Sequence, residues 1–139
     1  EAGAIATGAI LDVQPLGPPY SEFVHDHDLI GKYRKNAESL GRLFSPPSTK
    51  VAGSTDMANV SLLMPTIHPM LGLDSGTAVN HQPEFAAYCR TPDADRAAVE
   101  GALAMALTAV DAASDDETRT RLLGHKTSYS EIGEYPWSF

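Results

Sequence analysis

Large apolar side chains are scarce in this sequence, and their scarcity limits the core that the chain can form. Leu, Ile, Val and Phe together provide 29 of the 139 residues, whereas Ala alone provides 19. Small side chains remove little apolar surface from water, and stabilisation by burial scales with that surface. The length suits one domain or a part of a larger one. We therefore expect a modest core that depends on a neighbouring surface.

Charge and hydropathy narrow the class of protein. Eighteen acidic and ten basic residues give a net charge of −8, which opposes binding to the phosphate backbone of a nucleic acid. No apolar run approaches the roughly 18 to 20 residues that cross a bilayer, and the N-terminus has no leader-type segment. The single cysteine, Cys89, excludes an internal disulfide and a cysteine-cluster metal site. We expect a cytoplasmic protein without nucleic-acid or membrane partners.

Three segments have the composition of strands. Residues 4–13 contain β-branched side chains and end at a proline-rich linker over 14–19. Residues 60–67 and 69–73 form short apolar runs bounded by proline or by polar residues. Because helical segments alternate with these runs, the pattern predicts an α/β fold, a small sheet with flanking helices.

The helices have clearer signals. Apolar residues at spacings of three and four predict an amphipathic helix over 26–44. Pro83 suits the first turn of a short helix. Thr91 can cap free amides and Pro92 needs no backbone donor in a first turn, so a longer, Ala-rich helix is predicted from there to about Ala113.

The histidines are the first candidates for chemistry, and each has a structural alternative. In the run His25-Asp26-His27-Asp28, imidazole and carboxylate alternate as in a metal site, but at a helix start the two rings diverge and the aspartates complement the helix dipole. His68 lies between Ile67 and Pro69, where it can orient a polar substrate group or bond a backbone carbonyl. His81 lies in a loop before a helix, a position where α/β folds bind ligands.

The turn Gly53-Ser54-Thr55-Asp56 is equally ambiguous. Its hydroxyls and carboxylate can orient a metal-bound histidine, or its amides can bind a substrate carboxylate. The same side chains can instead satisfy their own backbone as a capped turn.

Several segments together resemble one family. They are Gly53 to Ser61, Pro65 to Pro69, His81 to Phe85, and the Ala-rich helix opened by Pro92-Asp93-Ala94-Asp95. In this order they resemble the C-terminal part of the co-catalytic zinc amidohydrolase and peptidase family, which includes aminoacylases, carboxypeptidases and aminobenzoyl-glutamate hydrolases. The resemblance runs from about Glu1 to Leu123, and its dipeptidase-like branch looks most similar.

The resemblance implies a domain organisation. Residues 1–14 look like the end of a lid and dimerisation domain, and residues 15–125 look like the C-terminal half of a zinc-exopeptidase-like catalytic domain. Residues 126–139 are a tail of unknown role, for which docking on the domain and binding of a partner are the alternatives.

The resemblance also implies roles for single residues. His81 corresponds to the last ligand of a centre that holds two zinc ions in the complete enzyme. Gly53, Ser54, Thr55 and Asp56 are expected to line the substrate site. His68 is expected near it.

Other parts of the family's metal centre do not match this sequence. The first His with its neighbouring Asp, the bridging carboxylate and the pair of glutamates precede the lid in the family, and Asp115-Asp116 follows the last predicted helix. A catalytic zinc needs about three protein ligands, so we expect the fragment alone to be inactive. The resemblance also implies a missing N-terminal half, whose absence would expose apolar faces, so self-association or this missing half is the expected partner.

Two hypotheses follow for the function. The first is a part of a metal-dependent hydrolase that cleaves an amide or peptide bond of a small N-acyl amino acid or dipeptide-like substrate. The second is a non-catalytic binding or assembly domain that retains the scaffold.

Overall fold

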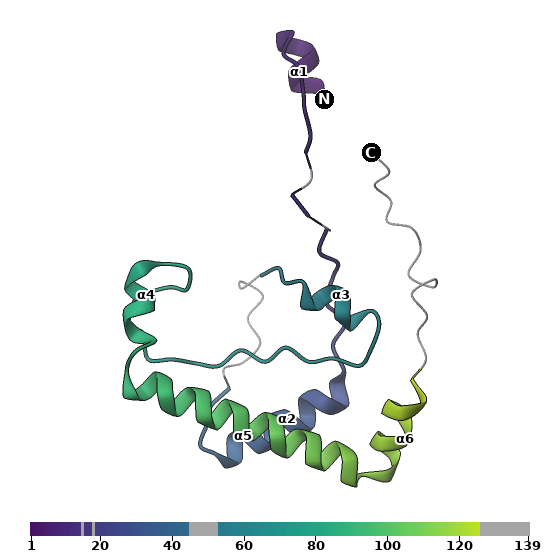
Figure 1. Cartoon of the computed structure of the whole chain (residues 1–139), viewed down its shortest axis with the longest axis vertical. Helices are drawn as coiled ribbons and strands as arrows, with labels where there is room; N and C mark the ends of the chain where they lie inside the picture. Colours follow the sequence, from purple (N-terminus) through teal and green to yellow (C-terminus); the bar gives the residue numbers. More distant parts are fainter. Residues whose placement is uncertain (15, 18, 45–52, 126–139) are drawn as a thin grey trace.

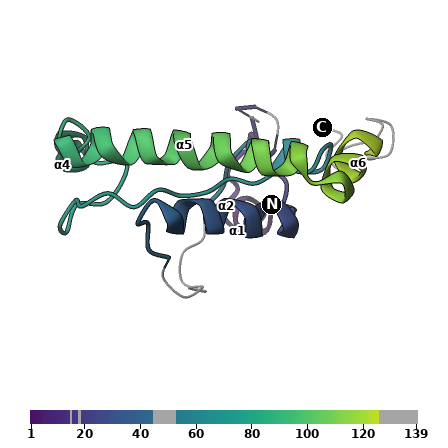
Figure 2. The same cartoon turned by 90° about the horizontal axis from the view of Figure 1, so that it is seen from below.

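The chain is described by a computed structural model over residues 1–14, 16–17, 19–44 and 53–125. In this part the long helix α5 crosses α2, while α4 and α6 lie at the two ends of α5 (Figure 1, Figure 2). The helices are α1 (Ala2–Thr7), α2 (His27–Ser39), α3 (Met57–Ser61), α4 (Pro83–Tyr88), α5 (Pro92–Ser114) and α6 (Asp116–Gly124).

The predicted α/β fold with a small sheet is wrong, because the described residues contain helices and no strand. Residues 2–7 form α1 instead of the first predicted strand, and α3 extends into the second. Residues 65–75 contain no helix, and Figure 1 shows them running alongside α5. A strand needs backbone partners as well as suitable side chains. Here Thr66 accepts a bond from the Asp26 amide (3.1 Å) rather than from another strand.

The structure confirms the predicted start of α2 but not its predicted end. At the start, the Asp26 carboxylate accepts a hydrogen bond from the Leu29 amide at 3.0 Å, as an N-cap does. At the end, Gly41 has a φ of 87°, and the Arg42 amide bonds the Ala37 carbonyl at 3.0 Å. Gly41 follows the C-cap Leu40, and its left-handed backbone, which favours glycine, ends the helix several residues before the predicted position.

Helix α5 confirms the long, Ala-rich helix that the sequence predicts. Thr91 caps its start by accepting a bond from the Ala94 amide at 3.3 Å, and Pro92 occupies the first turn. One face is buried and consists of small residues, namely Ala97, Gly101, Ala104, Thr108 and Ala112. Leu71 packs directly against the backbone at Gly101, and a Cβ there would displace a methyl group of Leu71.

The core lies at the crossing of α2 and α5. It contains Tyr33, Ala37 and Ala104, with Leu40 and Ile67 packed against them. Among the described residues, the buried apolar side chains are Tyr33 and five alanines. The fold therefore buries little apolar surface, as the composition indicated.

Polar contacts reinforce this crossing. Asn36 donates to Asp111 at 2.8 Å. The Nε of Arg42 lies 2.8 Å from Glu100, while its Nη1 donates to the Gly72 carbonyl at 3.0 Å. These contacts join both helices and the segment that follows α3.

Helix α6 was not predicted. Asp115 ends α5 and caps α6 by accepting a bond from the Thr118 amide at 2.7 Å. From α6, Thr118 donates to Asp28 at 2.7 Å, and Arg121 donates to Asp26 at 2.5 Å and to Asp28 at 3.2 Å. These bonds hold α6 against the start of α2.

These bonds change the acidity of both aspartates. Burial alone would raise the pKa of Asp26, but the bonds from Arg121 and the Leu29 amide outweigh it and lower the pKa. The bond from Thr118, followed by that from Arg121, lowers the pKa of Asp28. Because the pKa values of both aspartates are lower in the folded state than in the unfolded state, the bonds stabilise the fold fully above the unfolded pKa of about 3.9. This stabilisation is lost as the pH falls through the folded-state pKa values.

Arg121→Met should therefore lower the free energy of unfolding at neutral pH by about 1 kcal/mol, since the ion pair is partly exposed. The loss should shrink on acidification below about pH 3.9 as the aspartates become protonated. Urea unfolding followed by circular dichroism measures both effects. The control Arg96→Met removes exposed ion pairs with Asp93 and Glu100 within α5 and should cost less than Arg121→Met. Equal losses from the two substitutions at neutral pH would show that the α6 contact stabilises the fold no more than an exposed ion pair within α5 does.

Candidate functional site

His81 lies in the loop before α4 and has an unusual backbone. Its φ is 64°, the single positive value for a non-glycine residue in the described part of the chain, and its side chain is exposed. A left-handed conformation costs such a residue roughly 1 to 2 kcal/mol. Gln82 then returns to extended backbone, and Pro83 opens α4. The turn thus presents the imidazole at the surface directly before a helix.

The turn Gly53 to Asp56 precedes α3, and its polar groups form hydrogen bonds within the turn and with the first residues of α3. The Thr55 hydroxyl accepts a bond from the Met57 amide at 3.3 Å and lies 3.4 Å from the Asp56 carboxylate. The Thr55 carbonyl accepts from the Ala58 amide at 3.1 Å. Gly53, Ser54 and Asp56 are exposed. This geometry fits the capped-turn alternative and leaves the Asp56 carboxylate accessible to solvent.

His68 lies in a cluster of rings that the sequence did not predict. Its ring stacks on Phe23 with 6.2 Å between centroids, and His25 lies 4.4 Å from the same ring. Beside them is a pocket of about 160 Å³. The residues that line it are His25, Ile30, Tyr33, Arg34, Phe44, Ile67, His68 and Pro69. This pocket combines an apolar wall with basic and aromatic side chains.

Tyr33 forms the buried side of this pocket. Burial raises the pKa of its hydroxyl above the usual value of 10, although Arg42 acts in the opposite direction. The phenol therefore stays protonated at neutral pH and can donate a hydrogen bond.

The run His25-Asp26-His27-Asp28 forms the start of a helix, which was the structural alternative to a metal site. Asp26 caps α2, and both aspartates bind Arg121. His25 faces Phe23 and the pocket, whereas His27 is the exposed first residue of α2. The carboxylates are thus engaged in holding α6.

The predicted site residues do not meet in one centre. Figure 1 shows α4 at one end of α5 and α3 apart from it, with the segment that joins them running alongside α5. No group of three or more His, Cys, Asp or Glu that could hold a metal ion occurs within the described ranges. His81 is therefore not part of a zinc site formed by these residues alone.

Asn59 and Ser61, on α3, have structural roles that the sequence did not reveal. Asn59 accepts from the Ser21 amide at 2.9 Å and donates to the Pro19 carbonyl at 3.1 Å. Ser61 accepts from the Val24 amide at 2.9 Å. Both side chains hold the segment before α2 against α3 through bonds that join residues 37 to 40 positions apart, which no local pattern encodes.

Comparison with known proteins shows a similarity to peptidases. The Xaa-Arg dipeptidases of Mus musculus and Homo sapiens are each 30% identical to the chain over 113 residues, which cover 79% of the chain and 26% of each relative. The chain thus spans about a quarter of the length of these relatives. No family model and no solved structure matches the chain. The similarity supports a distant relationship to peptidases and amidohydrolases.

Proposed function

We propose that the chain is part of a metal-dependent hydrolase that cleaves the amide or peptide bond of a small N-acyl amino acid or dipeptide-like substrate. The observation that carries the proposal is the 30% identity to two dipeptidases over 113 residues. The net charge of −8 is compatible with a basic substrate such as a dipeptide that ends in arginine.

In this proposal His81 binds one of two zinc ions, and the other ligands come from a part of the enzyme that this sequence does not contain. The described residues do not fit a zinc site by themselves, because a catalytic zinc needs about three protein ligands. The exposed imidazole and the left-handed loop are suited to a ligand that completes a centre formed elsewhere. Gly53 to Asp56 and His68 are proposed to contact the substrate.

The test is hydrolysis by the 139-residue chain alone and by the longer polypeptide translated with its natural upstream coding sequence. Both are assayed with zinc on Xaa-Arg dipeptides and N-acyl amino acids. We expect activity in the longer polypeptide and none in the chain alone. An upstream sequence without His-X-Asp and Glu-Glu, or a longer polypeptide that hydrolyses no amide, would contradict the proposal.

The alternative is a non-catalytic binding or assembly domain that retains the scaffold. The observation in its favour is that the turn before α3 satisfies its own backbone and that the predicted site residues remain apart. The hydrolysis experiment separates the two, since a binding domain adds no activity in any length of chain.

Zinc binding by the isolated chain gives a further prediction. Calorimetric titration should show weak binding, because one imidazole cannot hold the ion, and His81→Ala should change it little. The control His125→Ala should behave in the same way. Tight, stoichiometric binding that disappears only in His81→Ala would mean that the chain forms a complete site.

A further inference from the structure

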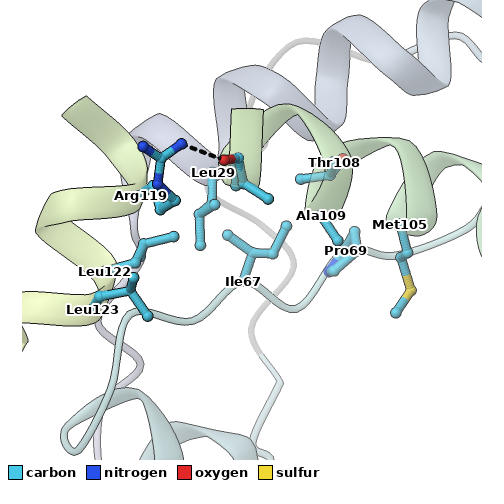
Figure 3. A pocket seen from close by; sticks show the side chains of 11 residues that line it. Leu29, Ile67, Pro69, Met105, Thr108, Ala109, Arg119, Leu122 and Leu123 are labelled. Carbon is cyan, nitrogen blue, oxygen red and sulfur yellow. Dashed lines mark hydrogen bonds between the residues drawn. The ribbon is translucent and has the colours of Figure 1, made fainter. Parts of the chain in front are cut away.

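An open apolar groove of about 440 Å³ lies between α5 and α6 (Figure 3). Its lining consists of Leu29, Ile67, Pro69, Met105, Thr108, Ala109, Ala112, Ala113, Arg119, Leu122 and Leu123. Several of these side chains remain in contact with solvent, with 59% of Met105 and 80% of Leu123 exposed. Such a surface is typical of a site that another segment covers.

We propose that residues 126–139 of the same chain occupy this groove through their aromatic side chains. Residues 126–139 lie outside the described part of the structure, so the proposal rests on the groove, on the place where this segment begins and on its sequence. It is independent of the proposed enzymatic function.

The place where the segment begins favours this occupant. Leu122 and Leu123 form one wall of the groove, and the segment starts three residues after Leu123. His125, the last described residue, lies with Nε2 3.1 Å from the Leu63 carbonyl, which fixes the point of departure. The α5 wall from Met105 to Ala113 measures about 12 Å at 1.5 Å per residue. Fourteen residues reach about 46 Å when extended, so the segment is long enough to follow the whole wall.

The sequence of the segment fits the chemistry of the groove. Residues 126–139 contain Tyr129, Tyr135, Trp137 and Phe139, four of the ten aromatic residues in the chain. Aromatic rings bury large apolar areas, while Tyr and Trp keep a polar tip for the edge of a site. Arg119 lines the groove, where its guanidinium donates to the Ala113 carbonyl at 2.8 Å and pairs with Asp116. An arginine held in this way can also stack on an aromatic ring.

Trp137 makes the proposal testable because it is the single tryptophan of the chain. Its fluorescence in the 139-residue chain is compared with that of a free peptide of residues 126–139. In the chain we expect emission at shorter wavelength and acrylamide quenching several-fold weaker than in the peptide. Emission and quenching equal to those of the peptide would overturn the proposal.

Matched variants locate the contact. Ala109→Glu places a charge in the groove, and Val110→Glu places the same charge on an exposed position of α5 outside it. We expect peptide-like quenching in the first variant and unchanged quenching in the second, with equal helical circular dichroism. Leu123→Lys, at an exposed groove position, replaces Ala109→Glu if that variant loses helicity.

Further outcomes of these measurements test whether residues 126–139 occupy the groove of their own chain. Equal quenching in Ala109→Glu and Val110→Glu would place Trp137 elsewhere and contradict the proposal. A shift that disappears on dilution, in parallel with dissociation seen by sedimentation, would mean that the groove accepts a second copy and would contradict it too. A shift that is independent of concentration supports docking within one chain.

Discussion

Tyr33→Ala should lower the free energy of unfolding by about 3 kcal/mol, the loss typical of removing a buried aromatic side chain. Tyr33 is 4% exposed and is the one large side chain among the buried apolar residues that the structure describes. Its ring lies at the crossing of α2 and α5 and meets Phe44 edge to face, with 6.5 Å between centroids. Because the other buried apolar residues are alanines, none can fill the cavity, and we expect much of the chain to unfold.

Urea unfolding followed by circular dichroism measures this loss against two controls. Tyr33→Phe keeps the ring and should cost less than about 1.5 kcal/mol. Tyr88→Ala removes a ring that is 37% exposed on α4 and should cost less than Tyr33→Ala. Equal losses from Tyr33→Ala and Tyr88→Ala would show that the crossing of α2 and α5 is not the core of the fold.

The helices were predictable because their signals are local. Thr91 and Pro92 start α5, and apolar spacing marks the buried face of α2. The end of α2 was predicted too late, since the run of apolar spacing continued to Phe44 while the left-handed Gly41 stopped the helix. Helix α6 was missed although Asp115 caps it, because its two leucines, Leu122 and Leu123, are adjacent and give no helical spacing.

Whether the predicted strands pair into a sheet could not be determined from the local sequence pattern. Residues 4–13, 60–67 and 69–73 have the side chains of strands, but pairing depends on a second strand at the correct distance. In the described structure the Thr66 carbonyl accepts from the Asp26 amide at the start of α2, and the Gly72 carbonyl accepts from the Arg42 guanidinium, so neither bonds a second strand. Composition alone does not contain this information.

The candidate site was only partly accessible to sequence reasoning. The position of His81 before a helix was correctly predicted, but its left-handed backbone was not, since such a conformation is uncommon outside glycine. The pocket beside His68 was missed because it joins side chains from residues 25 to 69 that no motif connects. The assignment of His81 as a metal ligand stays a prediction.

The activity of the longer polypeptide, translated with the upstream coding sequence, tests that assignment most directly. His81→Ala should lower its hydrolysis of Xaa-Arg dipeptides by at least about a hundredfold, because removal of a metal ligand exceeds the 10-fold to 100-fold loss typical of residues that only support one. The control His27→Ala changes an exposed residue at the start of α2 and should leave the rate within about twofold. Equal rates for the two variants would contradict the proposal that His81 completes a metal centre.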